Sequence, residues 1–191
     1  ESLATFLSFV SESSTLSRAM GGKLDLYRCF ISQASGLHHR DGRFGLIIPM
    51  SILADQYTAQ LRANLLQEQF IVQIDAFPQK DDPTRRIFVD AKLPTCVIVV
   101  THRNEGGDAS RLVIHPGRFL EEVAGQYEFR AQDIEDFDAD SMMIPMALSE
   151  AALQLAVRLR SDIRFEPLGN SMMSFQGEIN ETAMRDLISD N

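Results

Sequence analysis

The stretch that decides the fold lies at residues 42–51 and reads GRFGLIIPMS. Its centre, residues 44–48, is a short apolar run that Asp41 and Gly42 precede and Pro49 ends. An apolar run between such breakers is typical of a strand that is buried on both faces of a parallel sheet. We therefore expect an α/β fold around this strand.

Helical spacing flanks the strand on both sides. The apolar positions of a first helix are Leu24, Tyr27, Ile31 and Ala34. Asp25 stands at its start, where the helix dipole favours a negative charge. Ser51 is a suitable N-cap for a second helix that runs to about residue 69 and turns Arg62 towards water. The inward positions of that helix are Leu53, Tyr57, Leu61 and Leu65.

Further along the chain, apolar runs at residues 70–76 and 96–100 predict two strands joined by a polar connection, which closes the sheet with a hairpin. Beyond residue 104 we expect a short strand at 111–115, a short helix at 117–124 and a helix capped by Ser149. The predicted organisation is a loop or linker at 1–22, a partial catalytic domain at 23–103 and a mainly helical connector at 104–191.

Composition limits the function classes. With 18 Lys and Arg against 27 Asp and Glu, the net charge is −9, which argues against binding nucleic acid through bulk positive charge. The sequence offers neither an apolar run long enough for a membrane helix nor the basic start of a signal peptide, so we expect a soluble, cytoplasmic protein. Cys29 and Cys96 lie in apolar segments and are expected to be reduced, and no metal site is predicted.

Five segments carry a resemblance to a known family. They are KLDLYRCF at 23–30, GRFGLIIPMS at 42–51, LRANLL at 61–66, IDAF at 74–77 and FVDAKLPTCV at 88–97. In this order they resemble the N6-adenine-specific DNA methyltransferases of restriction-modification systems, in which the cofactor motif precedes the catalytic motif. The resemblance implies the second half of a Rossmann-like, S-adenosylmethionine-dependent methyltransferase sheet, mixed, with a terminal antiparallel hairpin. The run QGEINET at 176–182 resembles the entrance to the family's target-recognition region.

The resemblance implies a role in base recognition for Phe88. Enzymes that modify a base take it out of the stack, and an aromatic face then supports the flipped base. Phe88 matches the family's aromatic at this position, and Phe77 is the second candidate. From the residues alone, a loop phenylalanine more often anchors its loop in the core.

Cofactor contacts are implied for Asp25, Phe30 and Pro49. In the family, an aromatic on the helix after the catalytic loop approaches the adenine ring of S-adenosylmethionine, and Phe30 matches it, with Asp25 one turn earlier. Pro49 ends its strand at the carboxyl edge, where α/β sheets bind ligands. The alternatives are an apolar helix stripe packed on the sheet for Phe30 and a simple strand end for Pro49.

A small basic concentration surrounds Phe88. It consists of Lys80, Arg85, Arg86 and Lys92. Such residues bind DNA phosphates and position a duplex without reading its sequence. A solvated loop is the alternative, since that is the usual fate of surface charges.

Two motifs that the family's chemistry requires do not occur in the sequence. One is the glycine-rich turn that holds S-adenosylmethionine, and the other is the Pro-Pro-aromatic loop that accepts the adenine amino protons. We therefore expect no catalytic residue in this chain, which would be an inactive part of a longer enzyme. Its expected partners are double-stranded DNA and the missing N-terminal half of the catalytic domain.

Two other functions remain open. One is a noncatalytic module, derived from a methyltransferase, that serves in assembly or DNA docking; the other is a small-molecule methyltransferase, which the Phe88 segment and the QGEINET run disfavour. Half a sheet exposes an apolar edge strand, so we also expect a homodimer or pairing of that edge with the N-terminal segment.

Overall fold

The computed structural model describes residues 3–19, 25–162 and 164. The helices are α1 (Leu3–Glu12), α2 (Leu26–Leu37), α3 (Ala59–Ala63), α4 (Ala131–Phe137) and α5 (Glu150–Ser161). The strands are β1 (Arg43–Pro49), β2 (Gln69–Phe77), β3 (Thr95–His102), β4 (Ser110–Ile114) and β5 (Gly125–Phe129). Within this part of the chain no helix is both long and apolar enough to cross a membrane.

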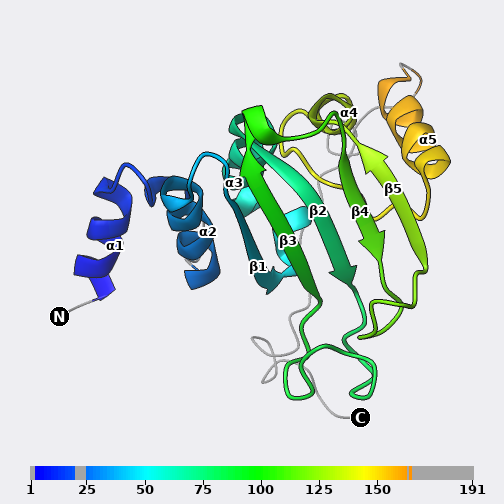
Figure 1. Ribbon diagram of the computed structural model, residues 1–191, viewed down its shortest axis with the longest axis horizontal. Coiled ribbons are helices and arrows are strands. Elements are labelled where there is room, and N and C mark those ends of the chain that lie inside the picture. Colours follow the sequence, from blue (N-terminus) through cyan, green and yellow to red (C-terminus); the bar gives the residue numbers. More distant parts are fainter. Residues whose placement is uncertain (1–2, 20–24, 163, 165–191) are drawn as a thin grey trace, which may run out of the picture.

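The strands form one mixed sheet in the order β1-β3-β2-β4-β5 (Figure 1). β3 pairs antiparallel with both β1 and β2, β4 runs parallel to β2, and β5 is antiparallel to β4. The α/β class and the β2–β3 hairpin are thereby confirmed. The sheet also continues across residue 104, because β4 and β5 extend it beside β2.

The position of β1 corrects one expectation. β1 lies at an end of the sheet, and among the described strands it pairs with the antiparallel β3 alone; Ile47 is 60% exposed. The prediction of a strand buried on both faces of a parallel sheet was therefore wrong for β1. In this apolar run Ile48 is buried, and Phe44 and Leu46 are half-buried against the core.

The core covers one face of the sheet. In β3 the side chains of Cys96, Ile98 and Val100 are buried, and they alternate with the half-buried Val97 and Val99. Helices and loops supply the other side of this core. Its members there include Ile31, Ile52, Leu61, Leu65, Ile134, Met142, Ile144 and Leu153. The register places Ile47, Val97, Asp75, Val113 and Gln126 side by side across the five strands.

Helix α2 confirms the first predicted helix, with Asp25 as its N-cap residue. The Asp25 carboxylate makes no capping hydrogen bond and lies 3.4 Å from the Arg28 guanidinium instead. Helix α5 also begins as expected, because the Ser149 side chain accepts a hydrogen bond from the Ala152 amide.

The continuous helix expected from Ser51 to about residue 69 was wrong. The segment contains 3₁₀ turns η2 (Met50–Leu53) and η3 (Gln56–Thr58), the short α3, and the π-helix η4 (Asn64–Glu68). Asp55 causes the first break, because its carboxylate accepts from the Tyr57 amide and starts a new turn. As a consequence, Tyr57 is exposed although it was expected to face inward.

Arg62 joins two segments of the interior instead of facing water as expected. It is 1% exposed and donates to the carbonyl oxygens of Ile52 and Asp55 on one side and of Ser141 and Met142 on the other. Burial lowers the pKa of Arg62 to about 10, so it remains charged at neutral pH. We call this arrangement the Arg62 junction.

Two other expectations differ from the structure, and a third cannot be compared with it. Residues 3–12 form α1, not a loop, so they do not pair as a strand with the edge of β1. Residues 117–124 contain no helix, and the strand β5 follows them directly. The QGEINET run at 176–182 lies outside the described residues.

Candidate functional site

Three parallel strands end at one edge of the sheet. β1 ends at Pro49, β2 at Phe77 and β4 at Ile114, and β3 starts at the same edge with Thr95. Loop 78–94 leaves this carboxyl edge after β2 and projects below the sheet (Figure 1). In α/β sheets this edge is where ligands bind.

Loop 78–94 carries Phe88 at the surface. Phe88 is 49% exposed, so its ring is not a core anchor, and its neighbour Val89 is 53% exposed. Lys80, Arg85 and Lys92 are exposed on the same loop. The loop therefore presents an aromatic ring among cations, although its role in base stacking and phosphate binding remains a prediction.

Arg86 is placed differently from the other basic residues. It is 6% exposed, and its Nη1 donates to the Lys80 carbonyl oxygen over 3.5 Å. Its Nε is buried and has no hydrogen-bond partner within the described part of the chain. The structure thus turns Arg86 into the loop, where it does not face a phosphate.

The start of α2 lies at the same edge as loop 78–94. The Tyr27 hydroxyl is 3.2 Å from Ser51 Oγ, and the Arg28 guanidinium is 3.9 Å from the Asp55 carboxylate. One residue before Ser51, the Met50 amide donates to the Pro94 carbonyl oxygen at the end of the loop (2.9 Å). Contacts therefore run without a gap from α2 through η2 to loop 78–94.

The three residues expected to contact the cofactor lie at α2 and at the end of β1, and their role remains a prediction. Asp25 and Phe30 belong to the start of α2, and Pro49 immediately precedes Met50. Phe30 is 65% exposed and leaves a ring face open, as binding of an adenine ring requires. Phe30 also shares an exposed stripe of α2 with Leu26 and Leu37, and this stripe equally suits packing against protein.

A histidine that the sequence did not single out lies beside this edge. His115 is 2% exposed and follows the last residue of β4. Its Nε2 lies 3.0 Å from Asp75 Oδ1, and its Nδ1 lies 2.9 Å from the Glu122 carbonyl oxygen. Its ring stacks on Phe77 at a centroid distance of 4.7 Å.

Both ring nitrogens of His115 face hydrogen-bond acceptors. The Glu122 carbonyl oxygen lies at Nδ1, and the Asp75 carboxylate lies at Nε2. Asp75 Oδ2 also accepts from the Gln73 side chain (2.7 Å). In the sequence, only the IDAF motif indicated the His115–Asp75 pair, because it places a carboxylate near the end of a strand. His115 itself lies 40 residues from Asp75.

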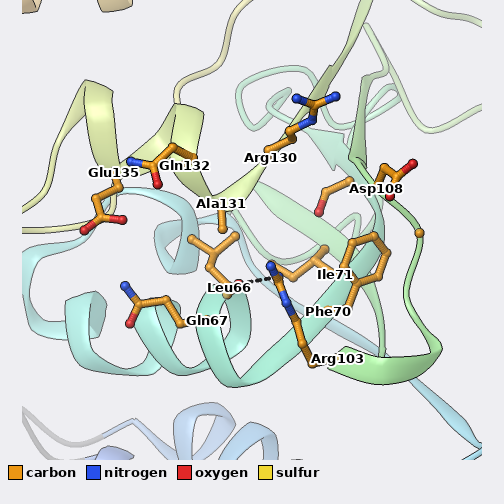
Figure 2. Close-up of a pocket in the computed structure, with 12 residues that line it drawn as sticks. Leu66, Gln67, Phe70, Ile71, Arg103, Asp108, Arg130, Ala131, Gln132 and Glu135 are labelled. Atoms are coloured by element: carbon orange, nitrogen blue, oxygen red, sulfur yellow. Dashed lines mark hydrogen bonds between the residues drawn. The ribbon is translucent and has the colours of Figure 1, made fainter.

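The opposite edge of the sheet contains a pocket of about 370 Å³ (Figure 2). Phe70 and Ile71 form its floor, Arg103 donates to the Leu66 carbonyl oxygen (3.0 Å), and Arg130 and Glu135 stand on the α4 side. None of the residues predicted to bind cofactor or DNA lines this pocket. We therefore place the candidate site at the carboxyl edge.

One protein-family model matches part of the chain. Residues 10–82 match the family model described as Eco57I restriction-modification methylase. Over these residues the chain is similar to restriction-modification methylases. The matched residues include α2, β1, β2 and the start of loop 78–94, and so most of the elements that form the candidate site. No curated protein matches the chain.

Solved structures of restriction-modification proteins are similar to the chain at low identity. The methyltransferase subunit of a type I restriction-modification system from Streptococcus thermophilus is 18% identical, with a TM-score of 0.45 and 82% of this chain covered. The type IIG restriction endonuclease BpuSI is 12% identical, with a TM-score of 0.41 and 59% of this chain covered. The chain spans 29% and 12% of their respective lengths.

Proposed function

We propose that the chain is part of an adenine-specific DNA methyltransferase of a restriction-modification system, acting in the cytoplasm. The complete enzyme would transfer a methyl group from S-adenosylmethionine to N6 of a flipped adenine. The observation that carries the proposal is the unbroken set of contacts at the carboxyl edge, where the start of α2, η2 and loop 78–94 meet. The match of residues 10–82 to a methylase family supports it.

In this proposal each element has a separate task. Phe88 stacks on the target adenine, and Lys80, Arg85 and Lys92 bind phosphates from the same loop. Arg86 is left out of the phosphate contacts because its side chain is buried. No residue of the chain is assigned to the methyl transfer itself.

S-adenosylmethionine fits the residues at the start of α2. The exposed ring of Phe30 offers a face for the adenine, and the half-exposed Asp25 offers a carboxylate for hydroxyl groups. The proposal adds Pro49, at the end of β1, as the third residue. When bound, the cofactor supplies the activated methyl group. These three residues form one wall of its site, and the remaining walls belong to another part of the enzyme.

The surface beside this wall suits the proposed partner. β1 is paired on one side only, Ile47 is exposed, and α2 exposes Leu26, Phe30 and Leu37. Such an open edge with an apolar neighbour pairs with further polypeptide. We assign it to the N-terminal half of the catalytic domain, and a homodimer through the same edge is the alternative.

The test uses the complete protein, duplex DNA and isotopically labelled S-adenosylmethionine. We expect N6-methyladenine among the nucleosides released from the DNA, identified by mass spectrometry. Phe88→Ala should weaken DNA binding by about 1 to 3 kcal/mol, because one stacking platform is lost. Val89→Ala is the matched control, since Val89 is equally exposed on the same loop but has no ring.

The outcomes separate the alternatives. DNA binding without methyl transfer would identify a noncatalytic docking module. Methylation of a small molecule or of cytosine would contradict the adenine assignment. If Phe88→Ala and Val89→Ala behave alike, Phe88 does not stack on the base.

A further inference from the structure

A second loop leaves the carboxyl edge next to loop 78–94. Residues 115–124 connect β4 to β5, and because β4 is parallel to β2, this loop projects from the sheet in the same direction (Figure 1). Arg85 of loop 78–94 donates from Nη2 to the carbonyl oxygen of Pro116 over 2.8 Å. The two loops, which we call the edge loops, therefore form one surface.

Loop 115–124 is fastened at both ends. At its start, the His115 amide donates to the Ala76 carbonyl oxygen (2.9 Å), and at its end the Ala124 amide donates to the Ile114 carbonyl oxygen (2.8 Å). The His115 ring holds the loop from inside through the carbonyl oxygen of Glu122. Both ends of the loop are thus held at the carboxyl edge.

The middle of loop 115–124 exposes apolar side chains to solvent. Phe119 is 51% exposed, and Leu120 and Val123 are exposed as well. The Arg118 guanidinium lies over the Phe119 ring at 5.2 Å from its centroid. Arg118 forms no ion pair with the residues that the structure describes, so its charge is not neutralised there.

We propose that loop 115–124 is a second DNA-contacting element, in which Phe119 packs against a base or sugar and Arg118 binds a phosphate. The proposal rests on the proposed function, because it places DNA at the carboxyl edge. An aromatic ring combined with a guanidinium is the pair of groups that binds nucleic acid through stacking and phosphate contact. The Arg118–Phe119 pair repeats on this loop what Arg85 and Phe88 provide on the first.

Charge alone does not favour DNA at this loop, since Glu121 and Glu122 accompany Arg118. The test must therefore measure the contribution of the Phe119 ring separately from that of the Arg118 charge. The ring contributes an interaction that does not depend on salt, whereas the phosphate contact releases counterions and makes binding salt-dependent. This difference distinguishes a DNA contact from a structural role of the loop.

The test measures binding of the complete protein to a labelled duplex by fluorescence anisotropy at several salt concentrations. Phe119→Ala should weaken binding about fivefold to a hundredfold with an unchanged salt slope. Arg118→Ala should lower the slope of log K against log salt by about 0.9, and Arg118→Lys should restore it. Leu120→Ala controls for apolar exposure in the same loop, and Arg158→Ala controls for a distant exposed arginine on α5.

Four results decide the matter. Weaker binding for Phe119→Ala with normal Leu120→Ala and Arg158→Ala supports the second contact. If Phe88→Ala weakens binding while Phe119→Ala and Arg118→Ala do not, the inference is overturned and the proposed function stands. If none of these variants changes binding, the inference is wrong and so is the stacking role proposed for Phe88. A lowered melting temperature for Phe119→Ala at unchanged affinity would show that the ring packs on protein, which also overturns the inference.

Discussion

The Arg62 junction and the edge loops both join segments that are far apart in the sequence, but they do so in opposite ways. Arg62 is buried, and its three nitrogens all donate hydrogen bonds to segments on both sides of the core. Arg85 is exposed and joins the edge loops through one hydrogen bond to Pro116. A buried, fully paired group stabilises a fold, whereas an exposed, sparsely paired surface is available to a partner. This contrast predicts that stability and binding are separated in this molecule.

The largest expected effect is a loss of folding stability on replacing Arg62, in the interior. Arg62→Ala removes the donor for Ile52, Asp55, Ser141 and Met142 at once and leaves their carbonyl oxygens buried without it. We expect the free energy of unfolding to fall by about 3 to 5 kcal/mol, as for loss of a buried charged partner. Urea unfolding followed by circular dichroism measures it.

Arg158→Ala is the control for the Arg62 variant, because Arg158 is an exposed residue near the end of α5. It should change the unfolding free energy by less than about 0.5 kcal/mol. Arg62→Lys should restore only part of the stability, since an ammonium lacks the planar fork. Equal stability of Arg62→Ala and Arg158→Ala would show that the junction does not stabilise the fold.

The difference between the two regions also explains what the sequence predicted. The strands β1 to β3 and their hairpin were predicted because each is an apolar run between breakers, a local pattern. The buried environment of Arg62 was not predicted. Its partners Ser141 and Met142 lie 79 and 80 residues away, and no local sequence pattern indicates such distant contacts. The helix from Ser51 failed for a local reason, because Asp55 caps a new turn within it.

At the candidate site, the sequence predicted an exposed basic loop at 78–94, but it wrongly predicted that Arg86 is exposed there. Phe88, Lys80, Arg85 and Lys92 are exposed in loop 78–94 as a surface role requires, but charge alone could not show that Arg86 turns inward. A helix was predicted at 117–124 from its composition. Tertiary contacts of His115 and Arg85 hold these residues as a loop instead.

A smaller effect, confined to the edge, is expected for His115→Asn. The shorter side chain cannot reach both Asp75 and the Glu122 carbonyl oxygen, and it no longer stacks on Phe77. We expect a loss of about 1 to 3 kcal/mol in the free energy of unfolding, because a buried pair is broken. Amide hydrogen exchange should become faster in residues 116–124.

His39→Asn serves as the control, since the side chain of His39 is 82% exposed. Exchange in the segments of the Arg62 junction, residues 50–58 and 138–144, should remain unchanged in both variants. Faster exchange there in His115→Asn would mean that the two regions are coupled, contrary to the separation argued above.

The smallest effect concerns the two thiols, which lie outside both regions, Cys29 on α2 and Cys96 in β3. Burial raises the pKa of Cys96, within β3, from 9.0 to about 12. Burial also raises the pKa of Cys29, which is half-buried on α2, and the positive charge of Arg28 partly offsets this increase. The reactive form is the thiolate, so near pH 8.5 iodoacetamide should modify Cys29 slowly and Cys96 only after unfolding. Peptide mass spectrometry resolves the two sites.

The sign of the pH dependence follows from the raised pKa of Cys96. In the unfolded chain this thiol ionises near pH 9, before it does so in the folded protein, so its contribution to stability is complete below pH 9 and is lost as the pH rises towards 12. Cys96→Ala should be less stable than the wild type at neutral pH, because a cavity replaces the sulfur. The difference between the two proteins should narrow above pH 9. Rapid labelling of Cys96 in the folded protein at pH 8.5 would show that β3 is not closed to solvent and that the interior is less rigid than the Arg62 junction requires.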